Sequence, residues 1–579
     1  MMSHRSMRCL VVGLVALMPT LAMAGSVPSN DDWANRIQIS PATLQLPGGF
    51  SDSQPDIALA TTEGSDPILA CKNGDTQQRG NTVWYGLNFA SPGQNFHVNL
   101  SALGYDDIVA IYTGTPGNFR PVAGACNDDG ASGFAAALAG VRLEGNVDYS
   151  IVVARPAQNP NPASLSFNIR SAPVYTVTKT ADTLDGQCDA DCSLREAISA
   201  ANAAPGAVII PAGDYTLTRT GSDNSNVNGD LDLTTGMAVY GAGRDSTRVF
   251  GNGAERVFDL DPGNTLGHTY AFKDLSVRNG AAGFTFGGGI NASSGATPGN
   301  EHLAVQRVEL SNNSTQLSGG GLRANGPTVV IDSVISGNTA ASDGGGLSFG
   351  GDANTRVDVA FSTINGNSST SGFSGGGGGI ASTSNTFIYN STVSGNQARF
   401  NGGGVLSTTA SGRINLINVT LADNRADSDG NAAGVGGGLR MEGNFGLVQN
   451  SAFAGNLVGN GSTVDDCSKS ASLTNINLAS NHLEAPSSSC GFSSGSGDVL
   501  GVPAGLAALA DNGGGTRTHL PQAGSPLIDS GSDLLCLGSD QRGIARPQDG
   551  DNSGTAQCDK GAVEVELSIP DSVFANGFE

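Results

Sequence analysis

The sequence predicts an all-β protein in which an N-terminal β-sandwich precedes a right-handed parallel β-helix with a short capping helix. Two observations carry this prediction. Short apolar segments alternate with turn residues in the first third of the chain, and a sequence repeat of 25 to 32 residues follows further along. Glycine accounts for 84 of 579 residues, as expected for a chain with many tight turns. Each repeat is too short for a crossover helix, so it is expected to form one coil of a β-helix.

Charge and composition exclude several classes of partner and structure. The formal net charge is −23 at pH 7, which argues against nucleic acid as a partner. The glycines follow no strict three-residue period, which excludes collagen. After the N-terminus, no stretch of 18 consecutive apolar residues occurs, so we expect no transmembrane segment in the mature chain.

Residues 1–24 are predicted to be a signal peptide. Arg5 and Arg8 give a positive start, residues 10–18 form a short apolar run, and residues 22–24 form an A-x-A cleavage site. We therefore expect the mature chain to be exported and to lie at the cell surface or outside the cell.

Eight cysteines follow the signal peptide, and an even number in an exported chain favours disulfides. Their spacing suggests four local pairs: Cys71–Cys126, Cys188–Cys192, Cys467–Cys490 and Cys536–Cys558. The competing interpretation is a metal site, but no histidine lies at ligand spacing near any pair.

Residues 28–172 are predicted to form the β-sandwich. Strand-like segments at 83–89, 96–100 and 149–153 alternate with clusters of Gly, Pro, Asn and Asp. Acidic doublets in this segment are candidate calcium ligands, since calcium prefers oxygen donors. The alternative is that Asp serves here as a turn residue. The candidates are Asp31, Asp32, Asp106, Asp107, Asp128 and Asp129.

Residues 174–235 are predicted to hold a cap and the first strands of the β-helix. Ser193 and Glu196 have the S-x-x-E spacing of a capping box, which predicts a helix over 194–202. An open stack of coils exposes an apolar end and unpaired strand edges, so it requires such a cap. Arg195 and Glu196 are also candidate catalytic residues, but we favour the structural role because Glu196 has a capping task.

Residues 236–460 are predicted to form the repeated coils. Each unit reads aliphatic, four residues, aliphatic, two residues, asparagine, and a glycine run followed by an aliphatic residue alternates with it. Equivalent asparagines in successive turns are expected to hydrogen-bond along the stack as a ladder. The ladder residues are Asn313, Asn338, Asn367, Asn396, Asn424 and Asn456.

Two sets of motifs carry a resemblance to bacterial surface proteins. Residues 188–198 read CDADCSLREAI and resemble the CSLREA segment, which in that family precedes a right-handed parallel β-helix. Within 461–566, segments at 511–529, 540–547 and 558–564 resemble the choice-of-anchor Q region, which closes the helix in the same family. The resemblance implies an architecture more than an activity.

Two further segments resemble parts of other exported proteins. Residues 28–172 resemble a prepeptidase-type β-sandwich domain at 30–35, 83–85, 105–114 and 126–129, which implies an accessory module rather than a catalyst. Residues 567–579 resemble a short tail of exported bacterial proteins, which implies a sorting role. The alternative for the tail is a frayed end or a final strand.

The sequence identifies no catalytic residue and no cofactor site apart from the calcium candidates. Hydrolases of sugars need paired carboxylates, but the acids between 281 and 460 form no column and no adjacent pair in the repeat register. Outside the repeats, the strongest candidate for a polar site is the group of Asp540, Arg542 and Arg546. We expect these residues to hold the terminal cap in place through Arg–carboxylate bonds.

The function that the sequence favours is binding without catalysis. We expect an adhesin-like protein that binds a polysaccharide, a cell-surface glycan or another surface through exposed Asn, Ser and Thr side chains along the stack. One alternative is a polysaccharide lyase or glycoside hydrolase acting on an acidic polysaccharide. The other is a structural scaffold without its own ligand.

Overall fold

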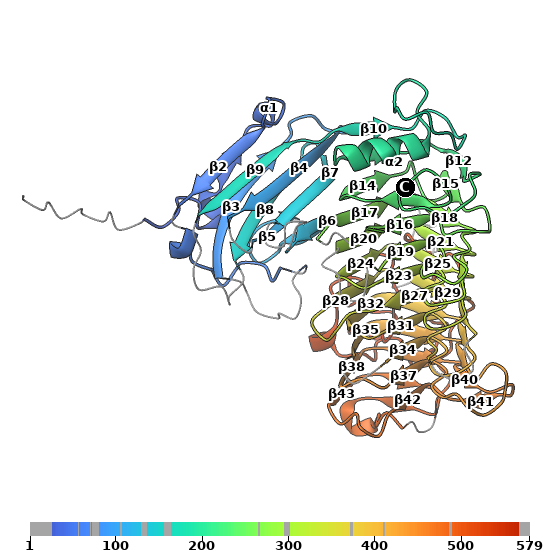
Figure 1. Cartoon of the computed structure of the whole chain (residues 1–579). Helices are drawn as coiled ribbons and strands as arrows, with labels where there is room; N and C mark the ends of the chain where they lie inside the picture. The colour runs from blue at the N-terminus through green and yellow to red at the C-terminus, as the bar shows by residue number, and fades with distance from the viewer. Residues whose placement is uncertain are drawn as a thin grey trace, which may run out of the picture.

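A computed structural model describes residues 26–566, apart from 56, 70, 72–79, 105–106, 129–135, 156–163, 264–266, 294–301, 371–374, 409–411 and 486–488. The predicted signal peptide (1–24) and the C-terminal tail (567–579) lie outside the described residues. Asp106 and Asp129, two of the calcium candidates, also lie outside them. The described chain is nearly all β, as predicted, and consists of a β-sandwich beside a parallel β-helix (Figure 1).

The N-terminal unit contains nine described strands and the short helix α1 (Pro41–Leu44). The strands are β1 (Ile37–Ile39), β2 (Phe50–Gln54), β3 (Gly80–Asn88), β4 (Asn95–Leu103), β5 (Ile108–Thr113), β6 (Arg120–Asn127), β7 (Ala136–Glu144), β8 (Asp148–Arg155) and β9 (Leu165–Ser171). One sheet has the order β2-β9-β4-β7 and the other β1-β3-β8-β5-β6. The two sheets enclose a core in which Tyr85 stacks on Phe167 with ring centroids 4.2 Å apart.

The β-helix is built from three sheets in which the strands of successive coils pair in parallel. The largest described sheet contains β10 (Val174–Thr176), β11 (Ala207–Ile209), β12 (Gly213–Thr216), β14 (Met237–Tyr240), β15 (Thr247–Phe250), β17 (Thr269–Lys273), β18 (Ser276–Arg278), β20 (His302–Gln306), β21 (Glu309–Ser311), β24 (Thr328–Ile331), β25 (Val334–Ser336), β28 (Arg356–Ala360), β29 (Thr363–Asn365), β32 (Asn385–Ser394), β35 (Arg413–Ala422), β38 (Phe445–Gln449), β39 (Ala452–Ala454), β43 (Ile476–Ala479), β44 (His482–Leu483) and β45 (Val499–Leu500).

The two other sheets form the remaining sides of the coils. One contains β13 (Leu231–Leu233), β16 (Phe258–Leu260), β19 (Ile290–Ala292), β23 (Leu322–Ala324), β27 (Leu347–Phe349), β31 (Ile380–Ser382), β34 (Val405–Ser407), β37 (Leu439–Met441) and β42 (Cys467–Lys469), and is called the β13–β42 sheet below. The other contains β22 (Ser314–Thr315), β26 (Thr339–Ala340), β30 (Ser368–Ser369), β33 (Gln397–Ala398), β36 (Arg425–Ala426), β40 (Leu457–Val458) and β41 (Thr463–Val464).

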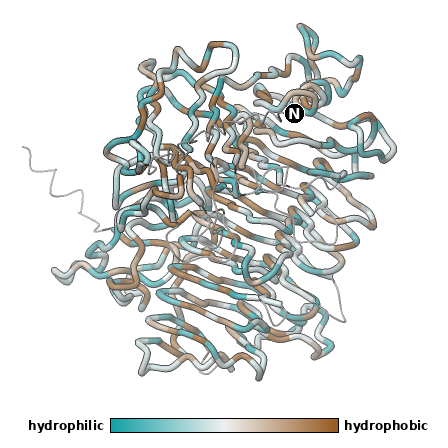
Figure 2. The backbone as a smooth tube through the Cα atoms, turned by 60° about the vertical axis from the view of Figure 1, so that its left-hand side comes forward, coloured by the Kyte–Doolittle hydropathy of each residue, from teal (hydrophilic) through white to brown (hydrophobic). Residues whose placement is uncertain are grey.

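The repeated aliphatic residues stack inside the coils. Val330 lies opposite Val359, and Ile335 opposite Ile364, in the parallel register of successive coils. The pairing also includes coils before and after the regular repeats, since Phe272 lies opposite Val305, and Val448 opposite Leu478. One continuous apolar core results, and Figure 2 shows hydrophobic stretches recurring in coil after coil with hydrophilic turns between them.

The helix α2 (Leu194–Ala203) covers the N-terminal end of this core. Ser193 accepts a hydrogen bond from the backbone N–H of Glu196, and the Glu196 carboxylate accepts one from the backbone N–H of Ser193, so the capping box is complete. Leu194, Ala197 and Ile198 are buried against the first coil. The helix therefore closes the open end of the stack, as its sequence predicts.

The segment after β45 lies along the side of the β-helix. Its backbone accepts hydrogen bonds from Asn390 in β32 (to Ser539, 2.7 Å) and from Asn450 between β38 and β39 (to Ser532, 2.9 Å). The resemblance to the choice-of-anchor Q region implied that this segment closes the end of the helix. It covers a lateral face instead, because its partners are spread over several successive coils.

The sandwich docks on the coils nearest α2, so that β6 and β7 face β14, β17 and β20 (Figure 1). Tyr240 accepts a hydrogen bond from the backbone N–H of Arg142 (2.8 Å) and donates one to the carbonyl of Gly140 (3.0 Å). The Arg142 guanidinium also lies 3.1 Å from the Asp274 carboxylate. These buried polar contacts fix the sandwich to one side of the stack.

Four disulfides join Cys71 to Cys126, Cys188 to Cys192, Cys467 to Cys490 and Cys536 to Cys558. Two lie in the β-helix and its cap, one in the sandwich and one in the C-terminal segment. Four disulfides are typical of extracellular proteins. Among the described helices, none has the length and apolar character needed to cross a membrane.

Candidate functional site

Three buried aspartates lie together at the N-terminal end of the β13–β42 sheet. Asp232 in β13 lies directly opposite Asp259 in the neighbouring strand β16. Their chain neighbours Leu231, Leu233 and Phe258 belong to the core, so alternation along a strand directs both aspartates to the outer face. One carboxylate oxygen each from Asp230, Asp232 and Asp259 lies within 4.8 Å of the others. We call these three residues the aspartate cluster.

Arg256 partly neutralises the aspartate cluster. Its guanidinium lies 3.0 Å from Oδ2 of Asp230 and 3.2 Å from Oδ2 of Asp259. Asp259 also accepts a hydrogen bond of 2.8 Å from the Asn291 side chain, which is its neighbour on the next strand. Asp232 is fully buried. Its Oδ2 atom accepts a hydrogen bond from the backbone N–H of Asn226, while its Oδ1 atom has no hydrogen-bond partner among the described residues.

Burial raises the pKa of the three carboxyl groups. It raises the pKa of Asp230 to about 8 despite the nearby Arg256, and the pKa of Asp232 to about 7. Burial also raises the pKa of Asp259. The charged forms are disfavoured because each carboxylate has lost water and faces other carboxylates. At neutral pH the cluster therefore favours a bound proton or a bound cation over three bare charges.

The cap positions the loop that carries Asp230. Arg195 of α2 forms an ion pair of 2.7 Å with Asp182 and donates hydrogen bonds to the carbonyls of Gly229 (2.8 Å) and Asp230 (2.9 Å). The Asn226 side chain returns a hydrogen bond to the Arg195 carbonyl (2.9 Å). The two residues that suggested catalysis in the sequence, Arg195 and Glu196, thus hold the cap and this loop in place.

A groove of about 300 Å³ opens beside the aspartate cluster. It is lined by the polar residues Asn224, Arg256, Asp259 and Asn291 and by the aromatic residues Phe284 and Phe286. We call it the acidic groove. The exposed fraction of Phe284 is 84%, and that of Phe286 is 39%. Such an apolar surface beside several hydrogen-bonding groups is typical of a ligand site.

Arg323 holds the Phe286 ring in place. Its guanidinium carbon lies 5.3 Å from the ring centroid, within the range of a cation–π contact. Arg323 lies opposite Asn291 in the same column of the β13–β42 sheet that contains Asp232 and Asp259. Two residues of this column, Asp259 and Asn291, line the groove directly, and Arg323 contacts one of its phenyl rings.

A second groove, of about 310 Å³, lies between the largest sheet and the C-terminal segment. Two of its charged groups, Glu309 and Arg244, already have partners in the protein. Arg278 pairs with Glu309 at 2.7 Å, and Arg244 donates to the carbonyl of Asp332 at 3.3 Å. We therefore regard the acidic groove as the better candidate for a ligand site.

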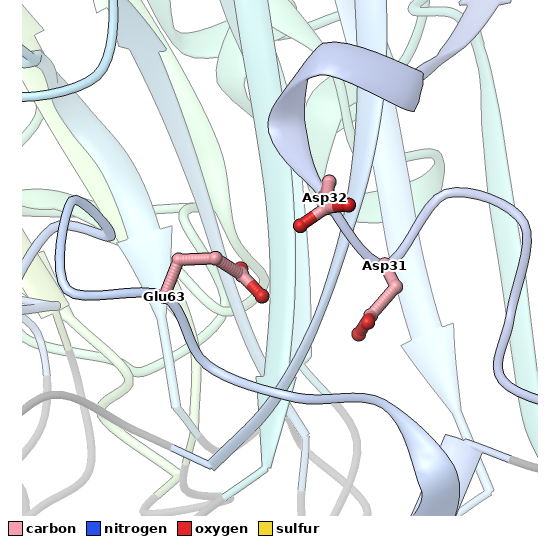
Figure 3. Close-up of side chains that lie close together, drawn as sticks. All are labelled: Asp31, Asp32 and Glu63. Carbon is pink, nitrogen blue, oxygen red and sulfur yellow. The ribbon is translucent and has the colours of Figure 1, made fainter.

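The structure places two of the predicted calcium candidates beside a third acid. Asp31, Asp32 and Glu63 come together at one edge of the sandwich, and Figure 3 shows their carboxylates grouped between two loops. The hydroxyl oxygen of Thr61 lies 2.8 Å from a carboxylate oxygen of Asp31 and 2.6 Å from one of Glu63, and so it lies between the two acids. Burial raises the pKa of Glu63. Calcium binding here remains a prediction.

The other described calcium candidates lie elsewhere. Asp107 is fully buried and Asp128 is 9% exposed. Neither belongs to the group of Asp31, Asp32 and Glu63 in the part of the chain that the structure describes. Both have interaction partners within the protein. Burial in the sandwich therefore separates these acids from the exposed edge.

The ladder asparagines are buried and face the interior of the stack. Asn338 donates through Nδ2 to the carbonyl of Leu310 and to Oδ1 of Asn367, both at 2.9 Å. All six ladder asparagines are at most 1% exposed. Hydrogen bonds between successive ladder asparagines follow the expected ladder pattern. Because the stack itself uses these bonds, the six asparagines are not among the exposed Asn, Ser and Thr side chains that we expect to contact a ligand.

The arginines of the C-terminal segment bind carboxylates within that segment. Arg542 pairs with Asp540 at 2.9 Å, and Arg546 pairs with Glu564 at 3.1 Å. Both side chains of the second pair are fully buried. This arrangement resembles an internal clamp rather than an open site.

The sequence prediction missed the aspartate cluster. The regular repeats contain no paired acids in register, and Asp232 and Asp259 lie in earlier coils, before the regular repeats begin. A signal was present in the triplets Leu231-Asp232-Leu233 and Phe258-Asp259-Leu260, which share an apolar–Asp–apolar pattern 27 residues apart. That distance is close to one coil, so this shared pattern is the signal by which the pairing of the two aspartates could have been predicted.

No protein-family model matches this chain, and no curated protein matches it in sequence. Among solved structures it is similar to catalytic domains of GH87 α-1,3-glucanases. One, in complex with nigerose, has 13% identity, covers 76% of this chain and 89% of its own, and gives a TM-score of 0.28.

Two other solved structures give similar values. The Agl-KA catalytic domain has 12% identity, covers 76% of this chain and 90% of its own, and gives a TM-score of 0.24. The catalytic unit of a GH87 α-1,3-glucanase from Streptomyces thermodiastaticus has 14% identity, covers 73% of this chain and 93% of its own, and gives a TM-score of 0.18. Similarity at this level does not extend to activity or substrate.

Proposed function

We propose that this chain is an exported surface or extracellular protein that binds a polysaccharide or cell-surface glycan without cleaving it. Export is supported by the four disulfides and by the N-terminal signal motif. The CSLREA and choice-of-anchor Q motifs support membership of that family of bacterial surface proteins, with a prepeptidase-type sandwich as an accessory module.

The observation that carries this proposal is the acidic groove. It combines two exposed phenyl rings with amide, carboxylate and guanidinium groups on a rigid sheet face. A sugar ring has the matching chemistry, because its C–H face packs on an aromatic ring while its hydroxyl groups bind the polar side chains.

The test is a binding measurement with a matched pair of variants. Neutral and acidic polysaccharides are cast into native gels, and the retardation of the mature chain is compared with that of Phe284→Ala. The Leu534→Ala variant is the control, since Leu534 is an apolar residue of 96% exposure on the C-terminal segment. We expect Phe284→Ala to weaken binding at least about tenfold without changing the melting temperature.

Two outcomes would count against this site. Equal retardation of the wild type and Phe284→Ala would place binding elsewhere on the chain. An equal loss of retardation for Leu534→Ala would indicate that the gels report nonspecific adsorption of exposed apolar side chains. Absence of retardation by every polysaccharide would favour the scaffold hypothesis.

A second candidate function is glycoside hydrolysis, which the pairing of Asp232 with Asp259 favours. Retaining glycosidases use two carboxyl groups about 5–5.5 Å apart, and oxygens of the aspartate cluster lie within 4.8 Å. This hypothesis predicts release of new reducing ends from a polysaccharide. Asp259→Asn would abolish that release.

A further inference from the structure

We propose that Asp230, Asp232 and Asp259 bind one calcium ion beside the acidic groove. The three carboxylates come from two neighbouring coils, and one oxygen of each lies within 4.8 Å of the others. Asp232 is fully buried, yet its Oδ1 has no hydrogen-bond partner among the described residues. A buried carboxylate oxygen without a partner requires an explanation, and a cation supplies one.

The charge balance fits a divalent ion. Arg256 contacts the Oδ2 atoms of Asp230 and Asp259, and Asp232 has no ion-pair partner among the residues that the structure describes. Three carboxylates and one guanidinium leave a local charge of −2, which one divalent cation neutralises. Asp223, Asp261 and Glu255 lie near enough to add further negative potential.

The donor set favours calcium over other metals. The cluster offers only carboxylate oxygens, whereas zinc and copper sites use histidine or cysteine. Calcium accepts six to eight oxygens in irregular geometry, while magnesium demands a near-ideal octahedron. A site assembled on two strands with a fixed arginine beside it suits the more tolerant ion.

This inference does not depend on saccharide binding. It does bear on the choice between the two candidate functions. Calcium keeps its carboxylate ligands ionised, which leaves no proton on them for a general acid. Occupancy by calcium would therefore weigh against hydrolysis by this cluster and for a structural role of the ion at the head of the groove.

The experiment measures calcium binding to the mature full-length chain, first stripped with EDTA, by isothermal titration. Two other acidic clusters exist in the described chain, Asp31–Asp32–Glu63 and Asp529–Asp549–Asp551, and each needs a control. The double variant Glu63→Gln, Asp551→Asn weakens both. We expect this double variant to keep one calcium site, and we expect Asp232→Asn added to it to remove that site.

Thermal unfolding gives a second readout that guards against misfolding. In EDTA, Asp232→Asn should melt at or above the wild-type temperature, because one of three mutually repelling carboxylates is gone. Added calcium should raise the melting temperature of the wild type and the double variant but not of variants that carry Asp232→Asn.

The proposal is overturned if the double variant binds no calcium up to about 10 mM, which exceeds the ~10⁻⁴–10⁻³ M range of extracellular calcium modules. It is also overturned if Asp232→Asn leaves both the number of sites and the calcium-induced rise in melting temperature unchanged. Should Asp232→Asn fail to fold, Asp259→Asn added to the double variant takes its place, and an unchanged number of calcium sites would again overturn the proposal.

Discussion

A ladder asparagine makes hydrogen bonds to the coils on both sides of it. The Asn367 side chain donates to the carbonyl of Ile335 and to Oδ1 of Asn396, each at 2.9 Å. Its own Oδ1 accepts from the backbone N–H of Asn338 at 3.0 Å. A serine or threonine hydroxyl has only one proton, so it could not donate both of these hydrogen bonds.

Replacing a ladder asparagine should therefore destabilise the stack strongly. We expect Asn367→Ala to lower the free energy of unfolding by about 3 kcal/mol, because several buried polar groups lose their partner at once. Asn365→Ala is the control, since Asn365 lies in the same coil and is only half-buried. Urea titration of both variants measures the difference. Equal, small effects would contradict the structural role of the ladder.

The ladder and the aspartate cluster differ in how far sequence alone predicts them. The asparagines recur at fixed offsets from two core positions in six units, so their alignment follows from counting. The alignment of Asp232 with Asp259 depends on loops of unequal length between degenerate coils. The missing partner of Asp232 Oδ1 depends on burial, which no local pattern encodes.

Among the secondary-structure elements, α2 has the clearest single task. It covers the first coil with its apolar face and holds the loop around Asp230 through Arg195. The sequence predicted its position to within one residue, because a capping box and a one-sided apolar pattern are local signals. The contact of Arg195 with the loop at 229–230 was not predictable, since it joins residues from different elements.

We expect Ser193→Ala to lower stability by about 1 kcal/mol, the usual loss for a removed N-cap. Saccharide binding should remain unchanged at temperatures where the variant is folded, because the cap residue does not line the acidic groove. Thermal unfolding and gel retardation of the same samples check both parts. Loss of binding without loss of stability would instead assign a direct functional role to this end of α2.

On the scale of the whole molecule, the docking of the sandwich buries a lysine. Lys273 in β17 lies 6.0 Å from the ring centroid of Tyr240, and Arg142, Arg307, Asp274 and Glu144 surround it. Burial lowers the pKa of Lys273 to about 7, and the two arginines add to this shift. The unfolded lysine has a pKa of about 10.4, so the unfolded state binds more protons between pH 7 and 10.

Wild-type stability should therefore gain from deprotonation of Lys273 as the pH rises from 7 to 10. We expect Lys273→Met to be more stable than the wild type by up to about 4 kcal/mol at pH 6, and this advantage should shrink toward pH 10. Urea titrations at pH 6, 8 and 10 measure it. Lys469→Met is the control because Lys469 is half-buried and remote from the interface. If the difference in unfolding free energy between Lys273→Met and the wild type does not change with pH, the lowered pKa of the buried Lys273 is contradicted.

The architecture as a whole followed from the repeat and the turn composition, because both are periodic properties of the sequence. The side-by-side docking of the two units was not predictable, since it rests on individual contacts such as Asn127 with Thr269 (2.8 Å). The lateral course of the C-terminal segment rests in the same way on isolated polar pairs spread over several coils.

The central claim is that this protein binds a glycan and does not cleave it. The most direct measurement incubates the mature chain with a panel of neutral and acidic polysaccharides, with and without calcium. Retention of the protein and release of new reducing ends are followed in the same samples. We predict retention on at least one polysaccharide without release from any. Release that disappears in Asp259→Asn would contradict this claim and assign a glycoside hydrolase.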